Sequence, residues 1–226
     1  MSEARLGRAA FLSVVGLGGV GLLAGGRIAG VASRPLSSVG SLVPSAVKDL
    51  VPDGWRIYAV NPPWPSFHAA TYRLEVTGLV DRPLALSWPE LRALAVARQT
   101  TDFHCVTGWT VGGVHWQGIR LSTLWEMARP QVDARYVNFV SMEHPYADTL
   151  TLDQTMLPNV MLAHSMDGAP LSRAHGAPLR LVIPEMYGYK NVKWVQRIEL
   201  VSRSHPGFWE QRGYDVDAWV GRSNGY

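Results

Sequence analysis

Short segments in which apolar and polar residues alternate recur along the chain after residue 55. Alternation with a period of two is typical of strands that bury one face. The first clear example, 72–76, places Tyr72, Leu74 and Val76 on one side of the backbone. The same pattern predicts further strands at 99–104, 136–142, 160–165, 179–183 and 192–201.

The segment 192–201 is the longest of these. Alternation along 192–201 predicts one face with Val192, Trp194, Gln196, Ile198 and Leu200, and an opposite face with Lys193, Arg197 and Glu199.

A tight turn is also expected. Asp167-Gly168, which follows the predicted strand 160–165, is a dipeptide typical of tight turns.

Two short helices are expected between the strands. Ser87 is followed three residues later by Glu90, which predicts a capping box and a helix over 88–96. A second helix is expected over 123–128, starting after Ser122. Strands outnumber helices and do not alternate regularly with them. The predicted class is therefore α+β, with strand-rich mixed sheets and short peripheral helices.

The N-terminal part of the chain differs from the rest. Two arginines precede an uncharged, largely apolar run over residues 9–26, which is the layout of an export signal or a short membrane anchor. Residues 1–32 are expected to be a signal peptide or membrane anchor, 33–54 a linker, and 55–226 the folded domain. This layout predicts a location in the periplasm or on the outer face of the cytoplasmic membrane.

Composition narrows the classes of function. With 226 residues, 47% of them hydrophobic, the chain can bury a substantial core. Its nine Trp and eight Tyr suit a large core or a deep ligand cleft. The net charge is only +3, and Lys and Arg form no dense stripe, which argues against a nucleic-acid surface.

The chain has one cysteine, Cys105, which follows the predicted strand 99–104 and precedes the loop Thr107-Gly108-Trp109. A single thiol cannot form an internal disulfide or a four-cysteine metal site. It can pack in the core, act as a nucleophile, or provide one soft ligand to a larger centre. The adjacent His104 would point to the opposite face of the strand, so it is a poor base for a nucleophile.

A second group of polar residues lies around the predicted strand 179–183. His175 and Arg180 lead into its apolar part, and Asn191 and Lys193 follow closely. At adjacent strand ends these residues would form a cradle for a phosphate, with Arg180 as a bidentate donor and Lys193 as a point charge. A solvated pair of surface cations is the alternative interpretation.

Together these features resemble the sulfite oxidase superfamily of molybdopterin-dependent oxidoreductases, which implies a sulfite-oxidase-like molybdopterin-binding fold. The chain is most similar to the bacterial branch that contains the periplasmic methionine-sulfoxide reductase catalytic subunit. The resemblance covers about residues 55–215. It is carried by Phe103-His104-Cys105, His175-Gly176-Ala177-Pro178-Leu179-Arg180 and Asn191-Val192-Lys193-Trp194, with support from Asn61-Pro62-Pro63 and Ser87-Trp88-Pro89-Glu90-Leu91.

The resemblance implies an enzyme with one Mo-molybdopterin per chain. The thiolate of Cys105 would bind the molybdenum, and a soft sulfur donor suits this metal. One protein ligand is sufficient because the pterin supplies further sulfur ligands. The resemblance also implies the other cofactor contacts, which are Asn61, Trp64, Ser141, His175, Arg180, Asn191, Val192 and Lys193.

Departures from the family pattern bear on the reaction. Sulfite oxidases carry an arginine-rich run after the metal-binding cysteine, whereas residues 106–110 are neutral, and Pro206 stands where those enzymes have an active-site tyrosine. Sulfite oxidation is disfavoured because a doubly charged oxyanion needs charge-assisted donors. The expected reaction is oxygen-atom transfer with a small sulfoxide-like or N-oxide substrate. Trp109 and Trp116 are candidates for its apolar wall, although core packing suits either residue.

The source of electrons is also informative. The sequence has no Cys-x-x-Cys-His motif and no cysteine set for an iron–sulfur cluster. An external partner, expected to be a membrane haem protein or a cytochrome, would therefore exchange the electrons.

The segment Arg8-Ala9-Ala10-Phe11-Leu12 resembles a twin-arginine export signal with its second arginine replaced. Two other functions are alternatives to a molybdopterin-dependent oxidoreductase. One is a non-catalytic docking module for a membrane redox protein, and the other is a cysteine-dependent hydrolase.

Overall fold

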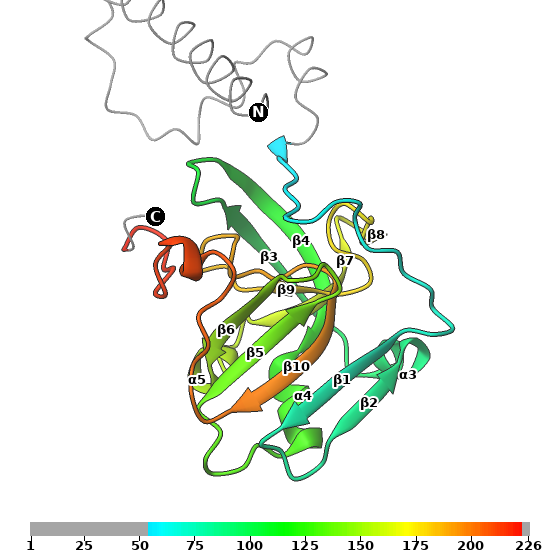
Figure 1. Cartoon of the computed structure of the whole chain (residues 1–226). Coiled ribbons are helices and arrows are strands. Elements are labelled where there is room, and N and C mark those ends of the chain that lie inside the picture. Colours follow the sequence, from blue (N-terminus) through cyan, green and yellow to red (C-terminus); the bar gives the residue numbers. More distant parts are fainter. Residues whose placement is uncertain (1–53, 223–226) are drawn as a thin grey trace, which may run out of the picture. The chain divides into compact units, whose positions relative to one another are not determined.

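The computed structural model describes residues 54–222 (Figure 1), and the expectations for residues 1–53 lie outside this range. Within it, two five-stranded sheets form the body of the domain. The first sheet is mixed, because its neighbouring strands β1 (Arg73–Gly78) and β10 (Val195–Val201) run parallel while its other pairs are antiparallel. Its order is β2-β1-β10-β5-β6, where β2 is Leu84–Ser87, β5 is Tyr136–Ser141 and β6 is Ala147–Thr151.

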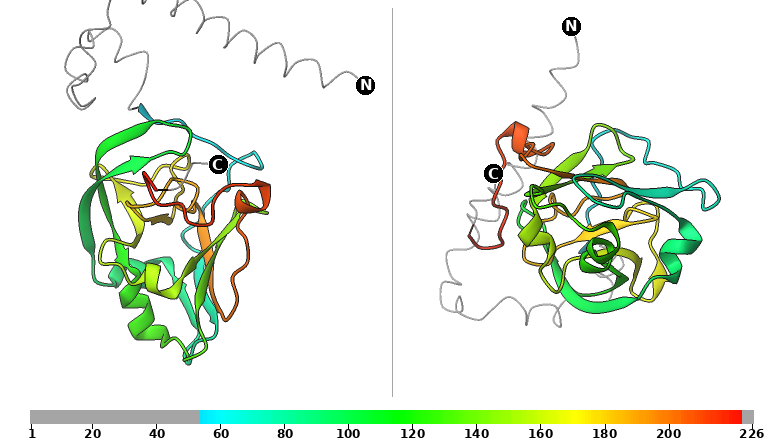
Figure 2. Two further views of the ribbon diagram at one scale, coloured as in Figure 1. Left: turned by 90° about the vertical axis from the view of Figure 1, so that its left-hand side faces the viewer. Right: turned by 90° about the horizontal axis from the view of Figure 1, so that it is seen from below.

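The second sheet is antiparallel and is built around a long hairpin of β3 (Ala97–His104) and β4 (Thr110–Arg120). Strand β7 pairs with β4 and also with the short strands β8 and β9. Figure 2 shows the hairpin curving along one side of the domain. The remaining strands are β7 (Met161–Met166), β8 (Ala169–Pro170) and β9 (Arg180–Val182).

Helices in the described part of the chain are short, and none of them is long and apolar enough to cross a bilayer. In Figures 1 and 2, α4 lies at the opposite end of the domain from the tip of the β3–β4 hairpin. The helices are α3 (Trp88–Ala93), α4 (Leu121–Ala128), α5 (Leu152–Thr155) and the 3-10 helix η4 (Glu210–Arg212).

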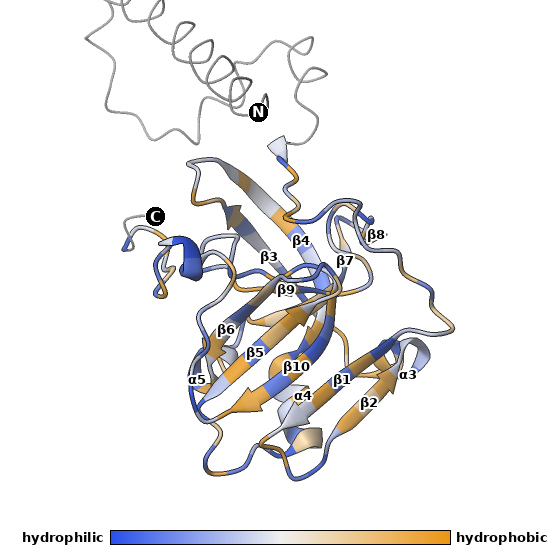
Figure 3. Ribbon diagram, in the orientation of Figure 1, coloured by the Kyte–Doolittle hydropathy of each residue, from blue (hydrophilic) through white to orange (hydrophobic). Residues whose placement is uncertain are grey.

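The main hydrophobic core contains residues of the first sheet and of α4. Leu74 on β1, Phe139 on β5 and Ile198 on β10 are fully buried, and α4 contributes Leu121 and Leu124. Figure 3 shows the apolar residues along these strands. Burial of each such side chain contributes about 1.5–3 kcal/mol, so this core holds the first sheet in place. A smaller cluster on the second sheet comprises Val114, Trp116, Met161, Ala163, Leu171 and Val182.

Alternation in the sequence located the strands well. The α+β class is confirmed, and each predicted strand corresponds to an observed one, namely β1, β3, β5, β7, β9 and β10. The predicted turn at Asp167-Gly168 is also present, since both residues have positive φ angles between β7 and β8. The sequence analysis did not predict β2, β4, β6 or the two-residue β8. In β4, three glycines weaken the alternation that marks a strand.

The prediction for the face of 192–201 was wrong in part. The strand starts only at Val195, because Trp194 has a left-handed backbone with φ 52°. An irregularity between Val195 and Arg197 then shifts the register, so Val195 and Ile198 are buried while Gln196 is exposed.

The helix boundaries also differ from the predictions. The capping box of Ser87 and Glu90 is confirmed, but α3 ends at Ala93 because the backbone of Leu94 is extended and leads into β3. Helix α4 begins at Leu121, two residues early, so Ser122 lies inside it. Its N-cap residue, Arg120, provides no side-chain hydrogen bond to the helix.

Gly118 of β4 provides a test of the packing between β4 and β7. A Cβ atom at this position would overlap the backbone carbonyl of Leu162, so Gly118→Ala must push the two strands apart. We expect the free energy of unfolding to fall by about 2–3 kcal/mol. Gly112→Ala in the same strand is the matched control, because its nearest neighbour, Asp102 Oδ1, is 3.5 Å away. Equal urea-unfolding curves for the two variants would contradict this packing.

Candidate active site

A cavity of about 220 Å³ lies where the end of β3 meets the segments before β1, after β5 and before β10. Four residues of the predicted site line it, namely Cys105, Arg180, Asn191 and Lys193. Aromatic side chains form much of the remaining wall: Trp55, Phe103, Trp109, Tyr146, Tyr189, Trp209 and Tyr214.

Cys105 follows directly after β3, in a tight turn that exposes its side chain to the cavity. Its N–H donates to the carbonyl of Trp109 at 2.9 Å, and its carbonyl accepts from Gly108 N at 3.0 Å. Gly108 has φ 88°, a conformation that favours glycine. The thiol of Cys105 is half-buried and lies 3.2 Å from the hydroxyl of Thr107. The turn therefore presents one sulfur atom to the cavity.

Arg180 is a buried cation, with 3% of its surface exposed. Its guanidinium lies 5.1–5.8 Å from the ring centres of Trp55, Phe103 and Trp116. It donates one hydrogen bond, of 3.3 Å, to the carbonyl of His175. No carboxylate of residues 54–222 forms an ion pair with it, and its Nε has no hydrogen-bond partner there. Burial lowers the pKa of Arg180 to about 10.

Lys193 is the second cation of the cavity. Its ammonium group donates to the carbonyl of Tyr58 at 2.6 Å and lies 4.1 Å from the ring centre of Trp194. Burial, with a further contribution from the charge of Arg180, lowers the pKa of Lys193 to about 7, and the carboxylate of Glu143 partly opposes this shift. An anion in the cavity would favour the charged form.

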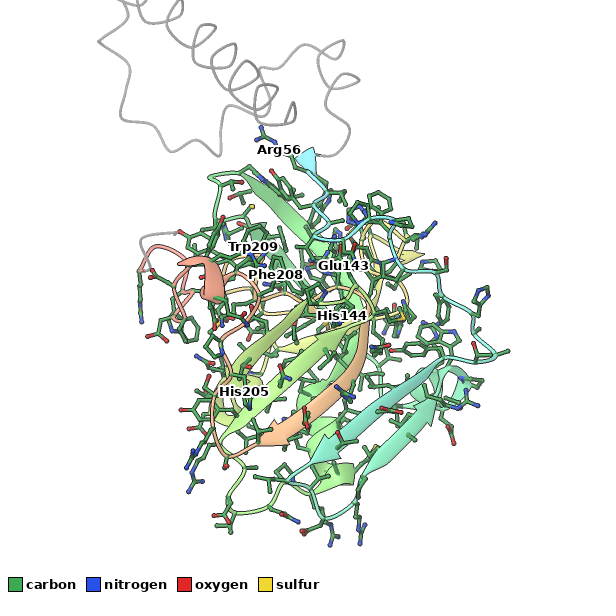
Figure 4. The ribbon with its side chains drawn as sticks, viewed as in Figure 1. Arg56, Glu143, His144, His205, Phe208 and Trp209 are labelled. Carbon is green, nitrogen blue, oxygen red and sulfur yellow. The ribbon has the colours of Figure 1, made fainter. Side chains whose placement is uncertain are left out.

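Residues 55–61 form a strap, an extended segment that borders the cavity and carries part of its wall. The carboxylate of Glu143 accepts the N–H groups of Val60 and Asn61 at 2.7 and 3.1 Å. The side chain of Asn61 donates to the carbonyl of His144 at 2.8 Å. Figure 4 shows Arg56 on the strap, and Glu143 and His144 on the turn after β5.

Ser141 joins this turn to the segment that carries Lys193. Its hydroxyl donates to the carbonyl of Lys193 at 2.8 Å and accepts from the N–H of Glu143 at 2.9 Å. Asn191 accepts from Ile183 N at 2.7 Å and so fixes the loop between β9 and β10. Ser141 thus supports the cavity wall from behind, whereas Asn191 both supports and lines it.

Four of the nine predicted site residues line the cavity, and the other five do not. Those five are Asn61, Trp64, Ser141, His175 and Val192. Val192 is fully buried in the core, and the carbonyl of Trp64 accepts a hydrogen bond from Arg173. His104 bonds to Thr110 at 3.0 Å. Of the two candidate tryptophans, Trp109 lines the cavity and Trp116 packs in the smaller core cluster.

Several wall residues were missed by sequence reasoning. Glu143 follows a predicted strand that ends beside the candidate Ser141, and this adjacency was a usable signal. Trp55 and Arg56 begin the predicted domain, but nothing in their pattern indicated a cavity. Trp209 and Tyr214 come from an irregular C-terminal segment with no periodic pattern. Their role becomes visible only in the folded chain.

Comparisons with known proteins identify the family of this chain. The family model of the oxidoreductase molybdopterin-binding domain matches residues 61–209, and the chain belongs to this family. It is similar to the uncharacterized oxidoreductase YuiH of Bacillus subtilis, with 38% identity over 150 residues that cover 66% of this chain and 75% of YuiH. It is also similar to the protein-methionine-sulfoxide reductase catalytic subunit MsrP of Gluconobacter oxydans, with 35% identity over 66% of this chain and 53% of MsrP.

Among solved structures, the fold resembles the sulfane dehydrogenase SoxCD of Paracoccus pantotrophus, with a TM-score of 0.59 and 19% identity over 78% of this chain and 57% of that one. The chain spans about half the length of the MsrP relatives that it matches. The family resemblance expected from the sequence is thereby confirmed, as is Mo-molybdopterin as the cofactor of the family.

The residues of this cavity fit such a cofactor. Three cations, Arg56, Arg180 and Lys193, line it together with one carboxylate, Glu143, which leaves a surplus of positive charge. A buried cation without a counterion is costly, and an anionic phosphate would offset that cost. The thiol of Cys105 lies in the same cavity and is a suitable soft donor for molybdenum.

The low pKa of Lys193 predicts a pH dependence of stability in the cofactor-free protein. Between pH 7 and 10.5 the unfolded chain holds a proton on Lys193 that the folded protein has lost. The free energy of unfolding should therefore rise with pH in this window. Lys193→Met removes this contribution, so wild type should gain about 1–2 kcal/mol relative to the variant across the window. Urea unfolding at several pH values measures the difference, and a pH-independent difference would contradict the assignment.

Proposed function

We propose that this protein is a Mo-molybdopterin enzyme that transfers an oxygen atom, reducing a small sulfoxide-like or N-oxide substrate. One observation carries the proposal. The thiol of Cys105 and the guanidinium of Arg180, which has no carboxylate partner among residues 54–222, line the same cavity. A metal cofactor with an anionic group would use both residues, because its metal would bind the thiol of Cys105 and its anionic group would pair with the guanidinium of Arg180.

Each residue has a specific task in this proposal. Cys105 is the protein ligand of molybdenum, and the cofactor when bound supplies the two-electron chemistry. Arg180 and Lys193 bind the phosphate, and the carbonyl of His175 orients Arg180. The further proposed contacts of the pterin are Asn61, Trp64, Ser141, Asn191 and Val192.

The surroundings of Cys105 favour a neutral substrate. Val106, Thr107 and Trp109, which follow the thiol, line the cavity without a charge. Aromatic side chains elsewhere in the wall would bury the apolar body of a sulfoxide. Reduction of a sulfoxide consumes two electrons and two protons and yields a sulfide and water. One similar protein is named a methionine-sulfoxide reductase, which supports this substrate class.

The two electrons come from outside the chain in this proposal. With a single cysteine, the sequence has no motif for covalently attached haem and no cysteine set for an iron–sulfur cluster. A membrane haem protein or a cytochrome on the extracytoplasmic side is the proposed donor. The N-terminal residues 1–32, as a signal peptide or anchor, would place the enzyme there.

Metal content and turnover test the proposal together. Protein produced in a molybdenum-replete host should contain about one Mo per chain and should oxidise a reduced dye when a sulfoxide or N-oxide is added. Cys105→Ser should lose turnover, because a hydroxyl is a poor ligand for this soft site. Thr107→Val, which alters only the neighbour of the thiol, is the control and should remain loaded with Mo.

Three outcomes would contradict parts of this proposal. A fully active Cys105→Ser variant would exclude the metal-ligand role. Turnover with sulfite alone would exclude the proposed substrate class. Wild-type protein that contains Mo but turns over none of these substrates would favour the docking module instead.

Arg180→Met should have opposite effects on the free and the loaded protein. Removal of an unpaired buried charge should leave the cofactor-free protein as stable as wild type or more stable. Loss of the charge-assisted hydrogen bonds should weaken cofactor retention by about 2–5 kcal/mol. Dialysis followed by Mo analysis measures retention, with Arg197→Met on the exposed side of β10 as the control. Unchanged occupancy would exclude the phosphate role of Arg180.

A further inference from the structure

A buried ion network lies next to the cavity and includes none of the predicted site residues. The ammonium group of Lys190 is 1% exposed and donates to three acceptors. These are the carboxylate of Asp148 at 2.8 Å, the carbonyl of Thr149 at 3.1 Å and the carboxylate of Glu210. All three N–H bonds of the ammonium group are therefore used.

The network has more carboxylates than its single lysine balances. Burial raises the pKa of Asp148 to about 7, against the opposing charge of Lys190. Gly207 packs closely on this carboxylate, since a Cβ there would lie 2.6 Å from its carbon atom. Breaking the network would leave buried charges without partners, a large cost. It is therefore a strong constraint on the positions of its members.

The network joins two segments that both reach the cavity. Lys190 lies between Tyr189 and Asn191, which line the cavity on the side of the loop before β10. Glu210 begins η4, and the residues around it, Trp209 and Tyr214, line the cavity from the C-terminal segment.

A continuous set of aromatic contacts connects the same segments. Figure 4 shows Phe208 and Trp209 on the C-terminal segment. The ring-centre distances are 5.6 Å for Tyr146–Phe208, 5.2 Å for Phe208–Trp209, 5.1 Å for Trp209–Tyr214 and 5.3 Å for Tyr214–Tyr189.

We infer that Lys190 is a positioning residue, whose ion network fixes Trp209 and Tyr214 as the wall of the cavity that contacts substrate. The inference rests on the proposed function for the identity of that substrate. The segment 203–214 belongs to neither sheet. Two further hydrogen bonds attach it to β6, from Thr149 Oγ1 to the carbonyl of His205 at 2.8 Å and from Phe208 N to the carbonyl of Ala147 at 3.0 Å. The network joins it to the loop at Lys190, together with the ring contact between Tyr214 and Tyr189.

This role predicts a specific pattern of kinetic change. Loss of the network should let Trp209 and Tyr214 move, which weakens contacts to the apolar body of the substrate. Cys105 and the basic residues are outside the network, so the chemistry should be little altered. The expected result is a raised KM with a nearly unchanged kcat.

The test uses a variant that removes every charge of the network at once, because Lys190→Met alone would leave two buried carboxylates without a counterion. In the combined variant Asp148→Asn, Lys190→Met and Glu210→Gln, we expect wild-type Mo content and a KM for a methyl sulfoxide about tenfold higher, with kcat within about threefold. Amide hydrogen exchange of residues 207–214 should be about tenfold faster. Ser204→Ala, an exposed change at a side chain of the same segment with no hydrogen bond among the described residues, is the matched control and should match wild type in all three measurements.

Each outcome decides the inference. An unchanged KM in a loaded combined variant, or unchanged exchange at 207–214, would overturn it. If the combined variant does not fold, Glu210→Gln is the second variant, because it keeps the ion pair of Lys190 and Asp148. Its KM and its hydrogen exchange at 207–214 should both increase, by less than in the combined variant. Wild-type values of both would overturn the inference. Hydrogen exchange needs no substrate, so it still decides whether the network holds the segment if wild type proves inactive and the proposed function fails.

Discussion

The guanidinium of Arg180 lies below the surface beside three aromatic rings, and much of the cavity is arranged around it. No carboxylate in the described part of the chain forms an ion pair with it, so its burial carries a cost that an anion in the cavity would offset. The low pKa of Lys193 follows in part from the same charge. Affinity for an anionic cofactor is thus built into the cofactor-free fold.

The sequence indicated some residues of this cavity and not most of its aromatic wall. Cys105 and Arg180 were candidates because they stand in motifs that resemble the family; from the residues alone, a packed thiol and a solvated surface cation were open alternatives. Trp209 could not be identified, and Glu143 was indicated only by its place beside Ser141, because their positions depend on contacts across more than 60 residues of chain, from Glu143 to Val60 and from Phe208, beside Trp209, to Ala147. Contacts of this kind leave no periodic signal.

The fold, too, could be predicted only where the pattern of residues along the chain reflects burial. Strands with one buried face, such as β1 and β5, were predictable because alternation records burial directly. Strand β4 was not, since three glycines interrupt its alternation, and one of them, Gly118, serves close packing against β7 instead of burying a side chain. The start of β10 was misplaced because the left-handed turn at Trp194 depends on tertiary context, which keeps Lys193 at the cavity.

The strap at residues 55–61 has a consequence for how a large ligand enters. Its backbone belongs to neither sheet, and side chains of Glu143 and Lys193 provide its hydrogen bonds at Tyr58, Val60 and Asn61. Opening of this segment would break those bonds, the hydrogen bond from the Asn61 side chain to His144 and the ring contacts of Trp55, but it would leave the strand pairing of both sheets intact. Local opening of the strap would therefore widen the way into the cavity for a large ligand without unfolding either sheet.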